Sequence, residues 1–226
     1  LGGSLVVAGL HSKVRVHIHV NDPSEVFRVA ARFGTVAGEK ADDMQRQQHS
    51  AHSTDRRVAI VTDSAADIPE AELDRLDIHM IPVRVHFGAR SYLDKVGITS
   101  DEFYAEIERG TELPKTSQPP PGDFRRQFEF LGSHHSAVIS INLTSRVSGT
   151  CAAAQTAAAR SATHGKVSVI DTGNVSAGQG LIAIGHHHGR QAGVMNIGIG
   201  ETDKDAGTQR TLRLHGFAAG LNLAVG

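Results

Sequence analysis

Aromatic residues are scarce in this sequence of 226 residues, which has no Trp, 2 Tyr and 8 Phe. Platforms on which nucleic-acid bases stack are therefore not expected. An excess of charge of one sign is also lacking, because 23 Lys and Arg stand against 24 Asp and Glu. A balance so close to neutral gives no electrostatic footprint for nucleic acid or for an anionic membrane. We therefore expect no nucleic-acid partner.

Cysteine and long apolar runs are the next absences. Cys151 is the only cysteine, so an internal disulfide is excluded and nothing indicates an oxidising compartment. The apolar run of residues 5–10 (LVVAGL) is too short to span a bilayer, and the beginning of the sequence lacks a signal-peptide pattern. We predict a cytoplasmic protein without stable membrane insertion. Because Leu1 stands within a predicted strand, we also expect the chain to be part of a longer protein.

Hydrophobic periodicity divides what is present into regions. Residues 1–45 predict two strands and a helix, since residues 14–20 (VRVHIHV) alternate like a half-buried strand and a helix can begin at Pro23 and end at Phe33. Residues 42–57 are polar without a period, and we assign 46–57 to an exposed linker. Residues 186–226, which contain His186–His188, have no clean period and stay unassigned.

Residues 58–185 alternate short apolar strands with helices. The predicted strands cover 57–61, 78–87, 137–143 and 166–171. The predicted helices cover 69–76, 99–110 with a capping box of Thr99 and Glu102, 123–131, 148–161 and 175–184. This alternation predicts an α/β fold with a mainly parallel sheet flanked by helices, preceded by a small α+β segment.

Hydroxyl-rich loops follow three of these strands, at residues 62–64 (TDS), 144–150 (TSRVSGT) and 171–176 (DTGNVS). In an open parallel sheet such loops share the carboxyl edge, where ligands bind. Ser148-Gly149-Thr150 also opens the Ala-rich helix, and a helix N-terminus is a natural anion site. The pattern predicts a small anion held by neutral donors. The alternative is that these Ser and Thr residues are ordinary helix caps and turn formers.

Catalytic motifs are not found. The sequence has no phosphate-binding loop, no dinucleotide fingerprint, no nucleophile elbow and no convincing Ser-His-Asp set. Cys151 stands at a predicted helix start, where a thiolate can be stabilised. Without an identifiable base, we expect it to be a buried structural thiol.

Histidine is abundant, with 14 residues. His17 and His19 share one face of a predicted strand, so they can begin a metal site or can be ordinary polar-face residues. We expect His134 and His135 to be solvated. The His186–His188 run either binds metal weakly or lies in an exposed loop.

Five motifs in order resemble the DegV family over about residues 58–185. They are residues 61–69 (VTDSAADIP), 81–83 (IPV) with 91–94 (SYLD), 114–119 (PKTSQP), 148–150 (SGT) and 171–176 (DTGNVS). Family members more often have Ser where Thr172 stands. The resemblance implies a two-lobed α/β protein with a fatty acid buried between its lobes. It implies a carrier that presents the acid to a separate kinase, which makes an acyl phosphate for phospholipid synthesis, so the carrier itself is not an enzyme.

The resemblance also implies which residues hold the ligand. Hydroxyls of the Thr-Ser-Gln-Pro loop and of the Ser-Gly-Thr turn bind the carboxylate, and neighbouring residues shape the pocket. In this sequence the implied ligand-binding residues are Thr62, Asp63, Thr116, Ser117, Ser148, Gly149 and Thr150. The implied partners are a long-chain fatty acid and a dihydroxyacetone-kinase-like fatty acid kinase subunit or domain, and the carrier role requires no cofactor.

Residues 13–34 resemble the end of the middle domain of that fatty acid kinase. His17 and His19 match a metal-binding pair of this domain, which implies zinc there with the remaining ligand upstream of Leu1. By this resemblance the chain is the tail of a kinase subunit fused to its carrier, without the nucleotide site. Residues 186–226 do not match the family's second lobe and are too few to form it, which a truncated or frameshifted reading frame would explain.

Two other interpretations stay open at this point. The chain can be a fragment of a kinase and carrier fusion with phosphotransfer activity only in the full-length protein. It can also be the non-functional product of a damaged gene.

Overall fold

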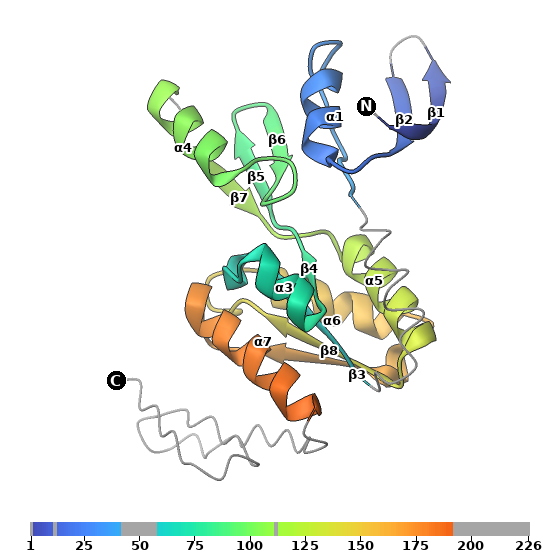
Figure 1. The fold of residues 1–226 in the computed structure, drawn as a ribbon, viewed down its shortest axis with the longest axis vertical. Coiled ribbons are helices and arrows are strands. Elements are labelled where there is room, and N and C mark those ends of the chain that lie inside the picture. Colours follow the sequence, from blue (N-terminus) through green and yellow to red (C-terminus); the bar gives the residue numbers. More distant parts are fainter. Residues whose placement is uncertain (1, 11–12, 42–57, 111–112, 192–226) are drawn as a thin grey trace.

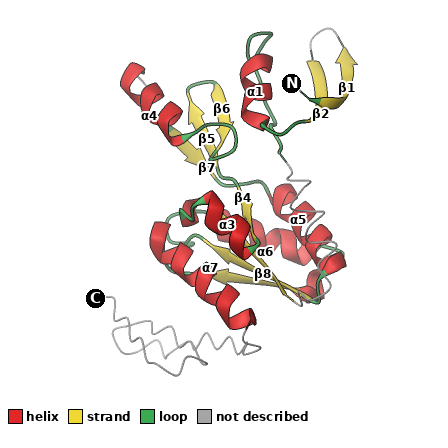
Figure 2. Ribbon diagram, in the orientation of Figure 1, coloured by secondary structure: helices red, strands yellow, loops and turns green. Residues whose placement is uncertain are grey.

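The computed structural model describes residues 2–10, 13–41, 58–110 and 113–191 (Figure 1). Helices, strands and loops in these ranges are distinguished in Figure 2. None of the helices in the described ranges has the length and apolar character that crossing a membrane requires.

A parallel four-stranded sheet forms the centre of residues 58–191, which we call the α/β lobe. Its strands lie in the order β4 (Ile78–Ile81), β3 (Val58–Asp63), β8 (Ala137–Asn142) and β9 (Val167–Asp171). Because β3 leads outward to β4 on one side and the later strands lie on the other, the chain reverses direction between β3 and β8. The carboxyl ends of these two strands therefore flank a topological switch point, where open α/β sheets bind ligands.

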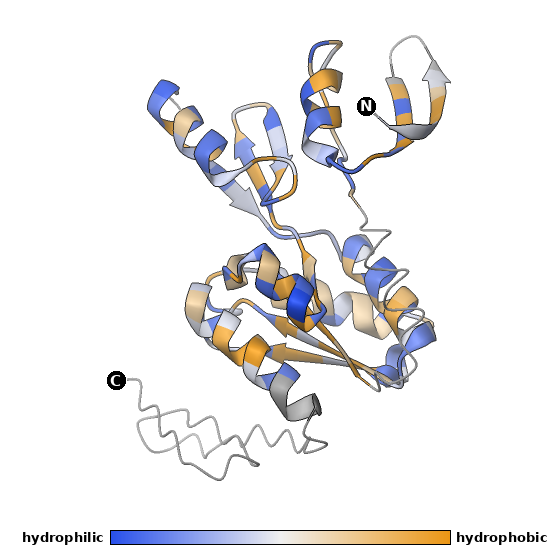
Figure 3. Cartoon of the chain, in the orientation of Figure 1, coloured by the Kyte–Doolittle hydropathy of each residue, from blue (hydrophilic) through white to orange (hydrophobic). Residues whose placement is uncertain are grey.

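Helices cover both faces of this sheet, which confirms the predicted α/β class. Side chains of β3 alternate between the faces, so Ile60 packs toward α3 (Glu70–Leu76) and α7 (Ser176–Gln191). Val61 packs toward α5 (Pro121–His134) and α6 (Thr150–Arg160). Figure 3 shows the strands as mainly hydrophobic between helices whose outer sides are hydrophilic. The Ala-rich face of α6 allows a close approach to the sheet.

A second, antiparallel sheet lies beside the first, with the order β6 (Arg90–Leu93), β5 (Arg84–Phe87) and β7 (Lys115–Ser117). It packs on α4 (Ser100–Arg109), and the predicted capping box of Thr99 and Glu102 is confirmed. The single predicted strand of residues 78–87 is wrong, because it divides between the two sheets. Pro82 has no N–H for a ladder, and the N–H of Val83 donates instead to Ser64 Oγ at 3.0 Å. The short strands β6 and β7 were not predicted.

The N-terminal segment, residues 2–41, contains a hairpin of β1 (Gly3–Leu10) and β2 (Lys13–His19) followed by α1 (Pro23–Ala30). Asp22 caps α1 and Pro23 occupies its first turn, as expected, but the helix ends at Ala30 rather than at Phe33. Val14 and Val16 of β2 are more than half exposed, so the prediction of a half-buried strand is not met in this structure.

The predicted linker at 46–57 lies outside the described residues, and so do residues 192–226. Residues 186–191, which the sequence analysis left unassigned, continue α7. His186 Nδ1 lies 2.8 Å from the carbonyl oxygen of Ile182, and His187 is buried. The alternative of an exposed loop for the His186–His188 run is therefore wrong.

Candidate ligand-binding site

Thr62 is the next-to-last residue of β3, beside the switch point, and its hydroxyl is hydrogen-bonded inside the core. Thr62 Oγ1 donates to the carbonyl oxygen of Ile141 at 2.9 Å and accepts from Gln179 Nε2 at 3.1 Å. All of these groups are buried, so the hydroxyl ties β3 to β8 and to α7. Thr62 thus joins β3 to β8 and α7 inside the lobe.

Asp63 is the next residue, and its buried carboxylate joins the ends of β3 and β8. Asp63 Oδ2 accepts from the N–H of Leu143 at 2.8 Å, and Oδ1 accepts from the N–H of Ala65 at 3.1 Å. Burial raises the pKa of Asp63, against the opposing hydrogen bonds from Leu143 and Gln179. The carboxylate therefore fixes the geometry of the switch point.

The Ser148-Gly149-Thr150 turn opens α6, as the sequence predicts. Ser148 Oγ lies 2.9 Å from Thr150 Oγ1 and accepts from the N–H of Thr150 at 3.2 Å. Thr150 is fully buried, whereas Ser148 and Gly149 are half-buried. Ser148 is therefore the residue of this turn that is placed to offer a hydroxyl to a ligand at the N-terminal end of α6, where an anion is favoured.

Thr116 and Ser117 belong to β7, and this strand separates their side chains. In the ladder with β5, Thr116 pairs with Val85 and Ser117 pairs with Arg84. Successive residues of a strand point to opposite faces, so these two hydroxyls lie on opposite sides of the small sheet. Ser117 Oγ lies 2.8 Å from His86 Nε2, and both residues are on the exposed side of the strand pair. The hydroxyls of Thr116 and Ser117 are therefore not placed to bind the same carboxylate.

Gln118 connects the two predicted loops. A β-carbon on Gly149 would clash with Gln118 Oε1, so the carboxamide of Gln118 lies directly over Gly149. The Thr-Ser-Gln-Pro loop and the Ser-Gly-Thr turn, far apart in the sequence, therefore meet at one place. Gln118 was absent from the predicted site residues, although it stands inside a recognised motif.

The buried thiol of Cys151 links this place to the switch point. Burial raises the pKa of Cys151 to about 11, and the carboxylates of Asp171 and Asp63 contribute to this rise. The carboxylates at the ends of β3 and β9 thus raise the pKa of a thiol in the first turn of α6. The prediction of a buried structural thiol is confirmed, since Cys151 is 1% exposed.

The polar groups of the hydroxyl-rich loop after β9 are hydrogen-bonded within the loop and to Asn142 and Ser145. Ser145 Oγ donates to Asp171 Oδ2 at 2.5 Å, and the N–H of Gly173 donates to Asp171 Oδ1 at 2.9 Å. Thr172 Oγ1 donates to the carbonyl oxygen of Asn142 at 2.9 Å. For these residues the alternative of ordinary turn formation describes the structure.

A second polar cluster brings together residues that the sequence analysis did not single out. Lys95 Nζ donates to Asp67 Oδ1 at 2.7 Å and to the carbonyl oxygen of Ser64 at 2.8 Å. Burial raises the pKa of Asp67, but hydrogen bonds from Lys95 and Ser176 outweigh it and leave the pKa lowered. Burial raises the pKa of Asp94 nearby. These contacts fasten β6 to the end of β3.

His17 and His19 lie together on β2, with their Nε2 atoms 3.1 Å apart. In the part of the chain that the structure describes, no group of three or more His, Cys, Asp or Glu side chains is arranged to hold a metal ion. His134 is exposed, as expected, but His135 is buried, with Nδ1 lying 3.0 Å from the carbonyl oxygen of Leu131. The prediction that His135 is solvated is therefore wrong.

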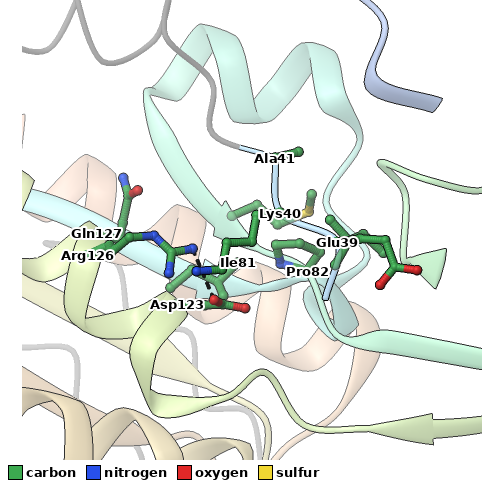
Figure 4. Close-up of a pocket in the computed structure, with 10 residues that line it drawn as sticks. Glu39, Lys40, Ala41, Ile81, Pro82, Asp123, Arg126 and Gln127 are labelled. Carbon is green, nitrogen blue, oxygen red and sulfur yellow. Dashed lines mark hydrogen bonds and ion pairs between the residues drawn. The ribbon is translucent and has the colours of Figure 1, made fainter. Parts of the chain in front are cut away.

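The pocket drawn in Figure 4 lies elsewhere, between the N-terminal segment and α5. Its volume of about 40 Å³ has room for water molecules but not for an acyl chain. It is lined by charged residues that include Glu39, Asp123 and Arg126.

Comparison with known families gives two matches along the chain. Residues 57–197 match the model of an uncharacterised protein family, the DegV family, and residues 1–51 match that of the FakA-like middle domain of fatty acid kinase. The DegV protein of Bacillus subtilis is 43% identical over 100 residues, which are 44% of this chain and 36% of that protein. A DegV domain-containing protein of Staphylococcus aureus is 41% identical over 121 residues, which are 54% of this chain and 42% of that protein. The chain thus spans less than half the length of these relatives.

Solved structures show the same fold. DegV of Bacillus subtilis, described as a fatty acid binding protein, gives a TM-score of 0.59 at 35% identity over 62% of this chain and 50% of that chain. A DegV family protein of Thermus thermophilus, described by its fatty acid binding, gives 0.57 at 31% identity over 61% and 48%. A DegV lipid binding protein of Thermotoga maritima gives 0.52 at 30% identity over 60% and 48%.

Proposed function

The chain belongs to the DegV family, and from this membership we propose that it is a carrier that binds one long-chain fatty acid by its carboxylate. Its α/β lobe has the fold of DegV proteins that are described as fatty acid binding. The observation that carries the proposal is the contact of Gln118 with Gly149, because it brings the two hydroxyl-bearing motifs to one place.

The chemistry of that place suits a carboxylate. Ser148 stands at the N-terminal end of α6 with a half-buried hydroxyl, and the carboxamide of Gln118, which carries N–H donors, lies over the adjacent Gly149. Neutral donors and a helix N-terminus favour an anion without a paired cation. Ser117 with His86 adds a second hydroxyl at the neighbouring strand. Thr62 and Asp63 join β3 to β8 through buried hydrogen bonds.

We propose further that the carrier presents the bound acid to a fatty acid kinase and does not itself catalyse phosphotransfer. The match of residues 1–51 to the FakA-like middle domain of fatty acid kinase supports this partner. The kinase partner is then either a domain of the same protein or a separate chain. The cytoplasmic location stays a prediction.

Mass spectrometry of lipid extracted from the natively purified chain tests the carrier proposal. We expect about one fatty acid per chain in the wild type and a clear loss in Ser148→Ala. Ser168→Ala, the same change at an exposed position of the edge strand β9, is the matched control and should retain the lipid. A folded wild-type chain that carries no fatty acid, and takes none up when it is supplied, would contradict the proposal.

A zinc site at His17 and His19 is a second proposal, and the distance between their Nε2 atoms supports it. Two nitrogen ligands about 2.0–2.1 Å from a tetrahedral zinc ion lie about 3.3 Å apart, close to the 3.1 Å found here. Competition with a chromophoric chelator tests the site. Because the pair supplies only two ligands, we expect the wild type to bind zinc weakly and His17→Ala to abolish this binding, whereas His134→Ala should not. Equal uptake by the wild type and His17→Ala would refute it.

A further inference from the structure

Glu39 is a buried carboxylate at the boundary between the two family matches. It is 5% exposed, and neither carboxylate oxygen has a hydrogen bond within the described structure. A buried charge is costly unless an opposite charge lies close by. That charge is Arg84, whose Nη1 lies 3.7 Å from Glu39 Oε2. Glu39 belongs to the segment that matches the kinase middle domain, whereas Arg84 belongs to the DegV match.

Arg84 also holds the backbone of the same segment. Both of its Nη atoms donate to the carbonyl oxygen of Glu39 at 3.4 Å. Gly38, with a φ of +74°, makes the turn just before this contact. Figure 4 shows Glu39, Lys40 and Ala41 lying against Ile81 and Pro82, with Asp123 and Arg126 of α5 facing them. Arg84 thus holds the segment against the α/β lobe through the Glu39 side chain and through the main chain of the segment.

The same arginine braces both ends of the ligand loop. At one end, Arg84 is the ladder partner of Ser117 in β5 and β7. At the other end, Arg84 Nη2 lies 3.2 Å from Asp123 Oδ2 in the first turn of α5. Asp123 in turn accepts from Arg126 Nη2 at 3.0 Å. The side chain of Arg84 therefore contacts the N-terminal segment and α5, whereas its backbone pairs with β7.

We propose that residues 38–41 are the docking element through which the N-terminal segment binds the α/β lobe, and that Arg84 relays this docking to the ligand loop. The partner that docks on this face of the lobe is the segment of the same chain, with Glu39 as its anchor. Docking stabilises the Arg84 side chain in the position that holds Asp123, at the α5 end of the ligand loop. By linkage, docking and ligand binding then strengthen each other equally. The relay rests on the proposed carrier function, whereas the docking does not.

Trypsin cleavage after Lys40 in the full chain measures the docking. Lys40 is exposed, but the adjacent Glu39 is held by Arg84, so cleavage requires the segment to detach from the lobe. We expect cleavage at least tenfold faster in Arg84→Met and in Glu39→Gln than in the wild type. Cleavage of the double variant should be no faster than that of the faster single variant, because both substitutions remove the same contact between Glu39 and Arg84. Circular dichroism identifies any variant that fails to fold, and Glu39→Gln then decides, since it preserves the shape of the side chain.

Arg28→Gln is the matched control. Arg28 Nε lies 3.8 Å from Glu102 Oε1, so this pair also joins the N-terminal segment to the lobe, but both side chains are about half exposed. Its loss should leave the cleavage rate within about twofold of the wild type. Unchanged cleavage in folded Glu39→Gln and Arg84→Met would overturn the docking.

The affinity for palmitate measures the relay. We expect Glu39→Gln, whose side chain lies outside the ligand site, to bind palmitate at least fivefold more weakly than the wild type and Arg28→Gln. Faster cleavage with unchanged palmitate affinity would overturn the relay and leave the docking established. A wild type that binds no fatty acid would refute the proposed function, while the cleavage rates would still decide the docking.

Discussion

The carboxamide of Gln118 occupies the space that a β-carbon on Gly149 would need. Glycine at position 149 is thus what allows the loop after β7 to close over the start of α6. Sequence motifs that are separated by about thirty residues become one site through this contact.

Gly149→Ala tests this relationship. The new methyl group must displace Gln118, whose exposed and flexible carboxamide can move, so we expect the free energy of unfolding to fall by only about 1 kcal/mol or less. Fatty acid binding should weaken at least tenfold, because the carboxamide of Gln118 leaves the proposed site. Calorimetric titration and urea unfolding measure the two effects. Adding Gln118→Ala removes the clash but not the loss of the donor, so an affinity in the double variant that equals the wild-type value would speak against a role for Gln118.

Thr62→Val is expected to act on stability rather than on binding. It removes the hydroxyl that donates to Ile141 and accepts from Gln179, leaving these two buried groups only their longer contact of 3.4 Å with each other. The free energy of unfolding should fall by about 1–3 kcal/mol in urea denaturation. The control is Thr156→Val, at an exposed position of α6, where the change should cost less than about 1 kcal/mol. A folded Thr62→Val with wild-type stability and impaired binding would show that Thr62 touches the ligand instead.

The raised pKa of Asp63 predicts how pH changes stability. The native state keeps the proton of this buried carboxyl to a higher pH than the unfolded chain does. Its contribution is therefore fully present below the ordinary aspartate pKa of about 4 and is lost as pH rises through the native pKa. In Asp63→Asn this pH dependence is gone. The stability advantage of the wild type over Asp63→Asn should thus narrow from pH 4 to pH 7, and an advantage that widens with pH would contradict the assignment.

Cys151 should be inert in the native protein. With a pKa of about 11, only about one thiol in a thousand is ionised at pH 8, and the side chain is buried as well. Ellman's reagent should react with Cys151 at least a hundredfold more slowly in the native chain than in the chain unfolded in guanidinium. Equal rates would mean that the start of α6 opens readily.

The parallel sheet could be predicted because β3 and β8 are apolar runs that are buried on both faces. The division of residues 78–87 could not, since apolar residues recur on both sides of Pro82 and only the partner of the Val83 N–H reveals the break there. The short strands β6 and β7, with 4 and 3 residues, are too brief to establish a period. The burial of His135 likewise depends on packing that no local pattern encodes.

The candidate site was predictable as motifs but not as geometry. The sequence identifies Ser148 and the loop of Thr116 and Ser117, but the opposite directions of these two hydroxyls follow from the pairing of β7 with β5. The position of Gln118 over Gly149 and the reach of Arg84 to Glu39 are tertiary contacts between distant residues. Such contacts leave no periodic signal in one sequence.

The most direct test of the account is the affinity of the full chain for palmitate, measured by calorimetry for the wild type, Ser148→Ala and Ser168→Ala. If Ser148 donates to the carboxylate, its loss costs about 1.5–3 kcal/mol, so palmitate should bind about 10-fold to 150-fold more weakly than to the wild type and to the exposed control. Equal affinity in all three folded chains would contradict the claim that the Ser-Gly-Thr turn holds the fatty acid.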